Sequence, residues 1–187
     1  MPTFLDRVTG CVDSGEDVDV IFMDFAKAFD KVPHIRLNRK LQSHGISGKL
    51  LNWISEWLVG RVQRVCINGV YSGWHLVTSG VPQGSVLGPV LFLIYINDID
   101  HGLSNWILKF ADDTKIFGVV TNIEESRVMQ DDLNKLLKWS EEWQMLFNND
   151  KCKVMHFGKK QSFQLLFEEP SANQCHSGKG LGYSDHR

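Results

Sequence analysis

The sequence has no surplus of basic residues. Its 187 residues include 20 lysines and arginines against 22 aspartates and glutamates, which gives a formal net charge of −2. A protein whose whole surface attracts nucleic acid needs an excess of positive charge. Any site for a polyanion on this chain must therefore be local.

Paired cysteines are also lacking. The four cysteines are far apart in the sequence and form no Cys-x-x-Cys pair: Cys11, Cys66, Cys152 and Cys175. This spacing indicates neither a structural zinc site nor a disulfide framework. We expect reduced thiols, as in the cytoplasm or the nucleus.

Long apolar segments are absent as well. Asp6 and Arg7 stand where a signal peptide would have its apolar core, and the longest apolar run, residues 86–96, is too short to cross a bilayer. With 43% hydrophobic and 11% aromatic residues, the composition is that of a folded globular protein. We expect an intracellular protein, in the cytoplasm, the nucleus or both, with no membrane partner.

Helical spacing of apolar residues predicts five helices. They cover residues 2–14, 34–44, 48–59, 86–101 and 123–147. Glycine follows each of the first three segments, at Gly15, Gly45 and Gly60, where helices commonly end. Pro89 falls in the first turn of the fourth segment, where proline is tolerated.

Strand patterns lie between these helices. Residues 19–25 are apolar on both alternating faces, which predicts a central strand that is covered on each side and ends at Asp24. Asn68-Gly69 between alternating apolar residues predicts a hairpin. Residues 153–157 predict a last strand.

A second hairpin carries two adjacent acids. Residues 106–110 and 114–120 have strand character and flank Ala111, Asp112 and Asp113. Aspartate is a common turn residue, and for an isolated pair this explanation is preferred. Neighbouring carboxylates nevertheless resist joint ionisation unless a cation lies between them. A third acid nearby would therefore indicate a metal site.

Asp24 supplies this third acid if the two strands are neighbours in one antiparallel sheet. Three carboxylates form a site of oxygen ligands that suits magnesium. Two such ions about 4 Å apart activate an attacking hydroxyl and stabilise a leaving phosphate. The three acids are thus a candidate site for phosphoryl transfer.

Four segments occur in the order of the palm motifs of a polymerase family. They are FMDFAKAFDKVPH, SGVPQGSVLGPVLFLIYIND, FADD and NNDKCKVMHF. On these motifs the sequence resembles the reverse transcriptases of LINE-like, non-LTR retrotransposons of the Jockey and CR1 type, from the N-terminus to about Gly158. The resemblance implies an α+β fold, a palm-like antiparallel sheet with helices packed on one face, and fingers and thumb largely absent.

The resemblance also implies the catalytic acids and the cofactor. Asp24, Asp112 and Asp113 would bind two Mg²⁺ ions, or Mn²⁺ in their place. The backbone carbonyl of Phe25 would be a further ligand.

Other residues would contact the substrates. Phe29 matches the aromatic steric gate against the ribose 2′-hydroxyl, although a phenylalanine here could equally pack in the core. Pro82, Gln83 and Gly84 match the loop under the templating base pair, where glycine allows close approach and an amide hydrogen-bonds without charge. In isolation the same residues would be no more than a helix entry.

Four basic residues are candidates for contacts with pyrophosphate or with the phosphates of the nucleic acid. Lys151 resembles the lysine that protonates the departing pyrophosphate, and Lys153 is close enough in sequence to be the alternative. Arg61 and Arg64 could contact template or primer phosphates, although exposed arginines on strands usually have no such role.

Several other aspartates, and one asparagine, are expected to have structural roles rather than to bind metal. Asn97-Asp98 is expected to be a helix cap or turn, and Asp131-Asp132 a solvated helix face. Asp30 follows the gate position and is expected to support the structure rather than bind metal.

We expect the protein to be an RNA-directed DNA polymerase that acts on an RNA template, a DNA primer and dNTPs. The alternative is a catalytically inactive or repurposed palm fragment that serves as a binding or scaffold module, which the near-neutral charge favours. An RNA-dependent RNA polymerase is disfavoured by the PQG loop and by the aromatic residue that leads the acids. A serine hydrolase is disfavoured because Gln83 stands where the nucleophile elbow needs glycine.

The domain is expected to cover residues 1–158. Residues 159–187 are polar, contain several glycines and lack sustained periodicity, which predicts a divergent, disordered tail.

Overall fold

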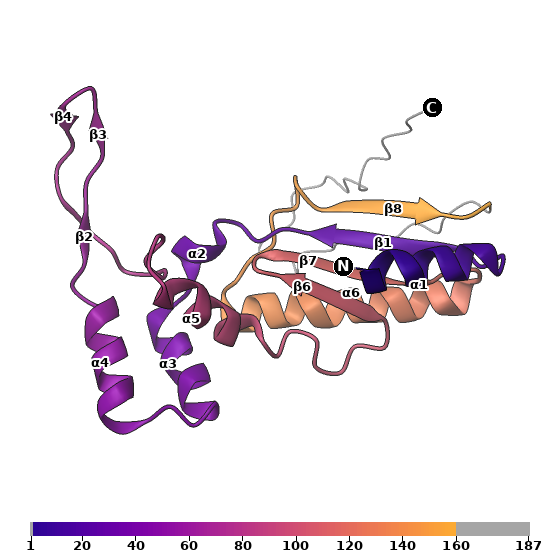
Figure 1. The fold of residues 1–187 in the computed structure, drawn as a ribbon, viewed down its shortest axis with the longest axis horizontal. Coiled ribbons are helices and arrows are strands. Elements are labelled where there is room, and N and C mark those ends of the chain that lie inside the picture. The colour runs from indigo at the N-terminus through magenta and orange to yellow at the C-terminus, as the bar shows by residue number, and fades with distance from the viewer. Residues whose placement is uncertain (1, 160–187) are drawn as a thin grey trace, which may run out of the picture. The chain divides into compact units, whose positions relative to one another are not determined.

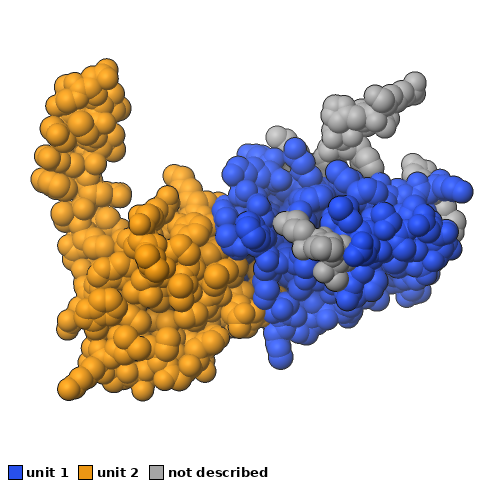
Figure 2. Space-filling view, viewed as in Figure 1, with its two compact units in different colours: residues 1–25, 100–142, 146–187 blue, residues 26–99, 143–145 orange. Residues whose placement is uncertain are grey.

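The computed structural model describes residues 2–159. The chain divides into two compact units (Figure 1 and Figure 2). Unit 1 consists of Met1–Phe25, Asp100–Glu142 and Leu146–Arg187, and unit 2 consists of residues 26–99 and 143–145. From residue 160 onwards the predicted tail lies outside the described residues, and the prediction of one domain over residues 1–158 stays a prediction.

Unit 1 is built on a four-stranded antiparallel sheet with the order β6-β7-β1-β8 (Figure 1). Its elements are α1 (Pro2–Asp13), β1 (Val18–Met23), β6 (Trp106–Phe110), β7 (Asp113–Val119), α6 (Ile123–Trp143) and β8 (Lys153–Phe157). The four predicted strands are confirmed to within two residues at each end. β1 is an inner strand and is buried along nearly its whole length, which explains its apolar pattern on both faces.

Helices cover both faces of this sheet. On one face, Val8 of α1 packs in a cluster with Val20 and Phe117. On the other, the Met129 side chain of α6 comes within 3.3 Å of the position that a Cβ would take on Gly118. Successive residues of a strand point to opposite faces. The α+β class with an antiparallel sheet is confirmed, but the helices occupy two faces rather than the single face predicted.

Asp132 of α6 is fully buried, so the prediction of a solvated face is wrong for this residue and right only for the exposed Asp131. One of its carboxylate oxygens accepts hydrogen bonds from the backbone N–H groups of Ser104 and Asn105 at 2.9 and 2.8 Å. The ammonium of Lys135 lies 2.8 Å from the other oxygen. Burial raises the pKa of Asp132, but these hydrogen bonds outweigh burial and leave the pKa below its ordinary value. Asp132 thus satisfies the donors of the loop that leads into β6.

A second buried acid lies on β1. Asp19 is fully buried, and one of its carboxylate oxygens lies 2.6 Å from Nδ1 of His156 on β8. Its other oxygen has no hydrogen-bond partner among the described residues. Burial raises the pKa of Asp19, and the contact with His156 lowers it only in part. No sequence pattern singled out this pair, because the two residues are brought together by the pairing of β1 with β8.

Unit 2 contains the remaining helices and two short ladders. Its elements are α2 (Ala28–Lys31), α3 (His34–Ser43), α4 (Gly48–Leu58), β2 (Val62–Gln63), β3 (Cys66–Ile67), β4 (Val70–Tyr71), β5 (His75–Leu76) and α5 (Leu87–Ile96). The predicted helices and the Asn68-Gly69 hairpin are confirmed, although α5 and α6 end earlier than predicted, at Ile96 and Trp143. Within residues 2–159, no helix has both the length and the apolar character needed to cross a membrane.

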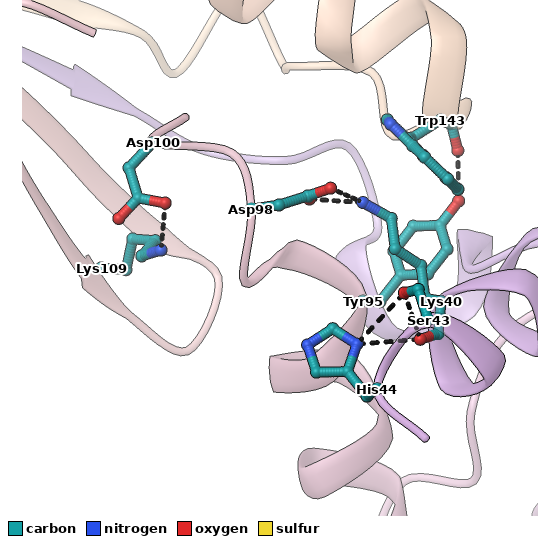
Figure 3. Close-up of polar contacts among 8 residues, drawn as sticks. All are labelled: Lys40, Ser43, His44, Tyr95, Asp98, Asp100, Lys109 and Trp143. Carbon is teal, nitrogen blue, oxygen red and sulfur yellow. Dashed lines mark hydrogen bonds and ion pairs between the residues drawn. The ribbon is translucent and has the colours of Figure 1, made fainter. Parts of the chain in front are cut away.

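A buried lysine connects α3 with the chain after α5 (Figure 3). The side chain of Lys40 is 3% exposed and forms an ion pair with Asp98. Its ammonium lies 3.6 Å from the ring centre of Trp143, and the hydroxyl of Tyr95 donates to the Trp143 carbonyl. An ammonium is buried without great cost only when other groups share its charge. Asp98 lies in the predicted turn, and its side chain is also the ion-pair partner of Lys40.

Candidate active site

Asp24 directly follows β1 at the end of the sheet. Its side chain is 27% exposed, so the carboxylate is accessible from solvent. Met23 pairs with Thr114, and the antiparallel register, continued by one residue, sets Asp24 beside Asp113. Acids from two distant segments thus reach the same end of the sheet, as their positions in the sequence predict.

Asp112 and Asp113 lie at the tip of the β6–β7 hairpin. Phe110 pairs with Asp113, so Ala111 and Asp112 form a two-residue loop. Ala111 has a φ of 53°, a left-handed conformation that costs an L-residue about 1–2 kcal/mol. Tight hairpin turns usually place glycine at such a position. A strained backbone residue therefore lies next to the two acids, and the same strain occurs elsewhere in the described chain at Lys27, Asn68 and Gln144.

Lys151 brings a positive charge to Asp24. Its Nζ lies 3.3 Å from each carboxylate oxygen of Asp24. The backbone N–H of Asn148 donates to the Asp24 carbonyl at 2.7 Å, which holds the turn containing Lys151 against the end of β1. Lys153 lies in β8 opposite Phe22. Of the two lysines considered from the sequence, Lys151 is the one that forms the ion pair with Asp24.

Phe25 anchors the chain immediately after Asp24. Its side chain is 2% exposed and stacks on Phe147 with ring centres 4.7 Å apart. Its backbone forms a bridge with the same residue. The ring is a core side chain, and the carbonyl of Phe25 as a metal ligand stays a prediction.

The three acids do not converge into a metal cluster. Among residues 2–159, no group of three or more His, Cys, Asp or Glu side chains is arranged so that it could hold a metal ion. The acids fit a divalent cation in their donor chemistry, since carboxylate oxygens are the preferred ligands of Mg²⁺. Asp24 also presents both oxygens to a cationic group, the ammonium of Lys151.

In unit 2, the loop before α5 is fixed to the chain around Phe29. The backbone N–H of Val81 donates to the Phe29 carbonyl at 2.7 Å, and the N–H of Gly80 to the Val32 carbonyl at 2.8 Å. Gly80 has a φ of 87°, and a Cβ at this position would lie 2.7 Å from the backbone of Asp30. Only glycine fits such a close approach.

The amide of Gln83 is oriented by Asp30. Its Nε2 donates to Oδ1 of Asp30 at 3.0 Å. The prediction that Asp30 supports the structure agrees with this contact. Gly84, the next residue, has a φ of 81° with open space around the position of a Cβ. The loop therefore needs glycine here for its backbone conformation and not for lack of room.

Pro82 is part of the entry to α5. Its carbonyl accepts a hydrogen bond from Oγ of Ser85 at 2.7 Å, and the same Oγ accepts one from the N–H of Gly88 at 2.9 Å. These bonds satisfy a donor of the first helical turn. This segment therefore forms the entry to the helix, and its contact with a template stays a prediction.

Phe29 is half-buried and stacks on Phe92 of α5, with ring centres 4.6 Å apart. This contact supplies the packing role that the sequence left open. The role of Phe29 as a steric gate stays a prediction.

Arg61 has a structural role. Its guanidinium donates to the carbonyls of Leu58 and Gly80 at 2.8 and 2.7 Å. Burial lowers its pKa from the ordinary value. These hydrogen bonds connect the start of the β2–β5 hairpin to the loop at Gly80. The guanidinium of Arg61 is therefore occupied by structural contacts and is not a free phosphate ligand.

A family model described as "Reverse transcriptase (RNA-dependent DNA polymerase)" matches residues 5–184, nearly the whole chain. The chain belongs to the reverse transcriptase family. Enzymes of this family act on an RNA template and use divalent metal ions.

Two relatives of this reverse transcriptase chain come from transposons. It is 28% identical over 186 residues to the "Probable RNA-directed DNA polymerase from transposon X-element" of Drosophila melanogaster, and 33% identical over 145 residues to the "RNA-directed DNA polymerase from mobile element jockey" of Drosophila funebris. These matches cover 95% and 73% of this chain but 20% and 16% of the relatives. The predicted resemblance to jockey-type non-LTR elements is confirmed, and the chain spans a fifth or less of these relatives' length.

The reverse transcriptase fold is also found in two solved telomerases. The structures from Candida albicans and Candida tropicalis, each in complex with a TWJ fragment of telomeric RNA, match with TM-scores of 0.61 and 0.57 at 14% and 15% identity. Each match covers 88% of this chain, and 31% and 30% of the telomerase chains respectively. At such low identity the likeness concerns the fold alone, and it confirms the palm-like α+β class.

Proposed function

We propose that this chain is the catalytic palm of an RNA-directed DNA polymerase of a jockey-type non-LTR retrotransposon. It transfers a nucleotide from a dNTP to the 3′-hydroxyl of a DNA primer along an RNA template. The proposal is supported by the strand register, which when continued by one residue puts Asp24 opposite Asp113 at one end of the sheet, and by the ion pair of Lys151 with Asp24.

The catalytic roles follow from the chemistry of the transfer. The primer 3′-oxygen attacks the α-phosphorus of the dNTP, gives its proton to solvent water and displaces pyrophosphate as the bond from the α-phosphorus to the bridging oxygen breaks. Two Mg²⁺ or Mn²⁺ ions bound by Asp24, Asp112 and Asp113, with the Phe25 carbonyl as a further ligand, would activate the hydroxyl and neutralise the leaving charge. Lys151 gives its proton to the departing pyrophosphate.

The substrate roles fall on unit 2. Phe29 excludes the 2′-hydroxyl of a ribonucleotide by contact with the sugar. Pro82, Gln83 and Gly84 lie against the templating base pair, where the Asp30 contact fixes which atoms of the Gln83 amide face the ligand. An amide held in one orientation can hydrogen-bond a base without adding charge.

Primer extension tests this proposal. The reaction uses poly(rA) template, oligo(dT) primer, Mg²⁺ and dTTP, and compares the parent chain with Asp24→Asn, Asp112→Asn and Asp131→Asn. The last variant is a matched control because it also removes one acid, from an exposed position on α6. We expect extension by the parent and the control, and none by the two active-site variants.

Two results would contradict the proposal. Undiminished extension by Asp112→Asn would show that the acids are wrongly assigned. No extension by a parent chain with a folded circular dichroism spectrum would favour the alternative, an inactive or repurposed palm that binds rather than polymerises.

A further inference from the structure

The hairpin between α4 and the Gln83 loop projects from unit 2 (Figure 1 and Figure 2). Every residue from Val62 to Leu76 is exposed. Its regular strand pairing is limited to two short ladders, β2–β5 and β3–β4, of two residue pairs each. Two-stranded ribbons are marginally stable in water, and contiguous exposed apolar surface usually marks a binding site. The hairpin is therefore a candidate for a surface that a ligand covers.

The two faces of the hairpin differ in chemistry. Ile67 pairs with Val70, and the backbone N–H of Ser72 donates to the Val65 carbonyl at 2.9 Å. Paired residues share a face and successive residues alternate, so Val65, Ile67 and Val70 form one aliphatic face. Tyr71 points to the opposite side.

The side opposite the aliphatic face carries a stack of flat groups. The guanidinium carbon of Arg64 lies 3.9 Å from the ring centre of Tyr71 and 4.5 Å from that of Trp74. Tyr71 and Trp74 remain 56% and 61% exposed. Arg64, Tyr71 and Trp74 are called the stacking face below. Cation–π contacts of this kind contribute about 0.5–1 kcal/mol each at an exposed site and so favour this arrangement of the three groups.

The hairpin also lies in a part of the chain without acids. Residues 57–97 contain no aspartate or glutamate, although the whole chain has a net charge of −2. Of the basic groups in this stretch, Arg61 is bound to the Leu58 and Gly80 carbonyls, which leaves Arg64, besides His75, to attract a phosphate. Residues next to them in the sequence supply no carboxylate that would repel it. Exposed aromatic rings together with arginine in an acid-free region are the combination by which proteins bind single-stranded nucleic acid.

We propose that the stacking face binds the bases of single-stranded RNA, in the template strand that has not yet been copied. This inference rests on the proposed function. Bases of the copied segment are paired and stacked on one another, whereas those of the uncopied template are free to stack on Tyr71 and Trp74. Arg61 fastens the root of the hairpin to Gly80, three residues before Gln83, so the hairpin is fixed to the loop proposed to contact the template.

The test measures RNA binding by the full chain without catalysis. Fluorescence anisotropy of a short unstructured RNA with a terminal fluorophore gives the Kd for the parent, for Tyr71→Thr/Trp74→Thr and for Ile67→Thr/Val70→Thr. Both double variants replace two exposed side chains of the same hairpin by strand-forming threonine, so they differ mainly in the face that they alter. A circular dichroism spectrum equal to that of the parent checks that each is folded.

We expect about ten-fold or greater loss of RNA affinity for Tyr71→Thr/Trp74→Thr and little change for the aliphatic pair. Arg64→Lys keeps the charge but loses the planar stack, so it should weaken binding while leaving the salt dependence of the Kd unchanged. Ultraviolet crosslinking of the same RNA should label Tyr71 or Trp74. A single-stranded DNA of the same sequence is measured as a competitor, because base stacking alone does not favour RNA over DNA.

Several outcomes would overturn the inference. Equal affinity of the parent and Tyr71→Thr/Trp74→Thr would refute it, and loss of affinity only in the aliphatic pair would place the ligand on the other face. Preference for DNA would assign the surface to the primer or target strand instead. If the chain extends primers but Tyr71→Thr/Trp74→Thr binds RNA as tightly as the parent, the inference about the hairpin fails while the proposed function stands. If the folded parent neither binds RNA nor extends primers, the proposed function fails too.

Discussion

The ammonium of Lys151 lies 3.3 Å from both carboxylate oxygens of Asp24, at the end of the central strand of the sheet. The side chain of Lys151 is 61% exposed, and exposed ion pairs contribute only about 0–1 kcal/mol to stability. The contact therefore does little for the fold. It places a proton donor next to the acid proposed to bind metal, where a lysine can meet the phosphates of a nucleotide.

Replacement of Lys151 by alanine should lower kcat for primer extension about 100-fold, because a positioned general acid is lost. Lys153→Ala is the matched control and should leave kcat unchanged, since Lys153 lies within β8. Lys151→Arg keeps the charge but does not give up its proton near neutral pH, so it should retain substrate binding better than kcat. Single-turnover extension over a range of pH measures these effects. A larger loss in Lys153→Ala than in Lys151→Ala would reverse the assignment.

The Asp30–Gln83 hydrogen bond should appear as coupling between the two residues in primer extension. If Asp30 acts by orienting the Gln83 amide, then Asp30→Ala, Gln83→Ala and the double variant should have similar kcat/KM, with a coupling energy of about 1 kcal/mol. Asp30→Asn keeps an oxygen acceptor and should be closer to the parent. Strictly additive losses would show that the contact has no role in positioning.

Loss of the Asp132 carboxylate should destabilise unit 1. Asp132→Ala removes the charged acceptor of the Ser104 and Asn105 donors, and a hydrogen bond to a charged group contributes about 1.5–3 kcal/mol. Its neighbour Asp131 is exposed, and Asp131→Ala should change stability by about 0.5 kcal/mol or less. Urea unfolding followed by circular dichroism compares the two variants. Equal unfolding midpoints would contradict the role assigned to Asp132.

Asp19 should make unit 1 less stable as the pH rises. Burial raises its pKa in the folded protein above the ordinary value of 3.8, and the hydrogen bond with His156 offsets this only in part. The folded state therefore holds the proton more tightly than the unfolded state, so the stabilisation is present at low pH and is lost as the pH rises through the folded pKa.

Asp19→Asn should lack this loss. The stability of the variant relative to the parent should increase from acidic pH to the range above the folded pKa of Asp19. Urea unfolding of both proteins at a series of pH values measures the difference. A difference that is constant across this range would show that Asp19 does not titrate differently in the folded and unfolded states.

The sequence by itself determined most of the secondary structure and the identity of the acids. The residues before Asp24 are apolar on both alternating faces, which predicts an inner strand, and Asn68-Gly69 predicts a hairpin. Both signals can be recognised in the sequence because they depend on residues close together in the chain. The order of four motifs then indicates the family, and with it Asp24, Asp112 and Asp113 as candidates for one site.

Only the tertiary structure decided which distant groups meet. The pairing of β1 with β7 brings the segments of Asp24 and Asp113 to the same end of the sheet. The pairing of β1 with β8 puts His156 against Asp19, and a turn brings Lys151 rather than Lys153 to Asp24. The same holds for Asp132, which a local pattern assigns to a solvated face although it is buried against a loop from another segment. Local sequence sets the face on which a side chain lies, but whether that face is covered, and by which charge, depends on contacts between segments that lie far apart in the chain.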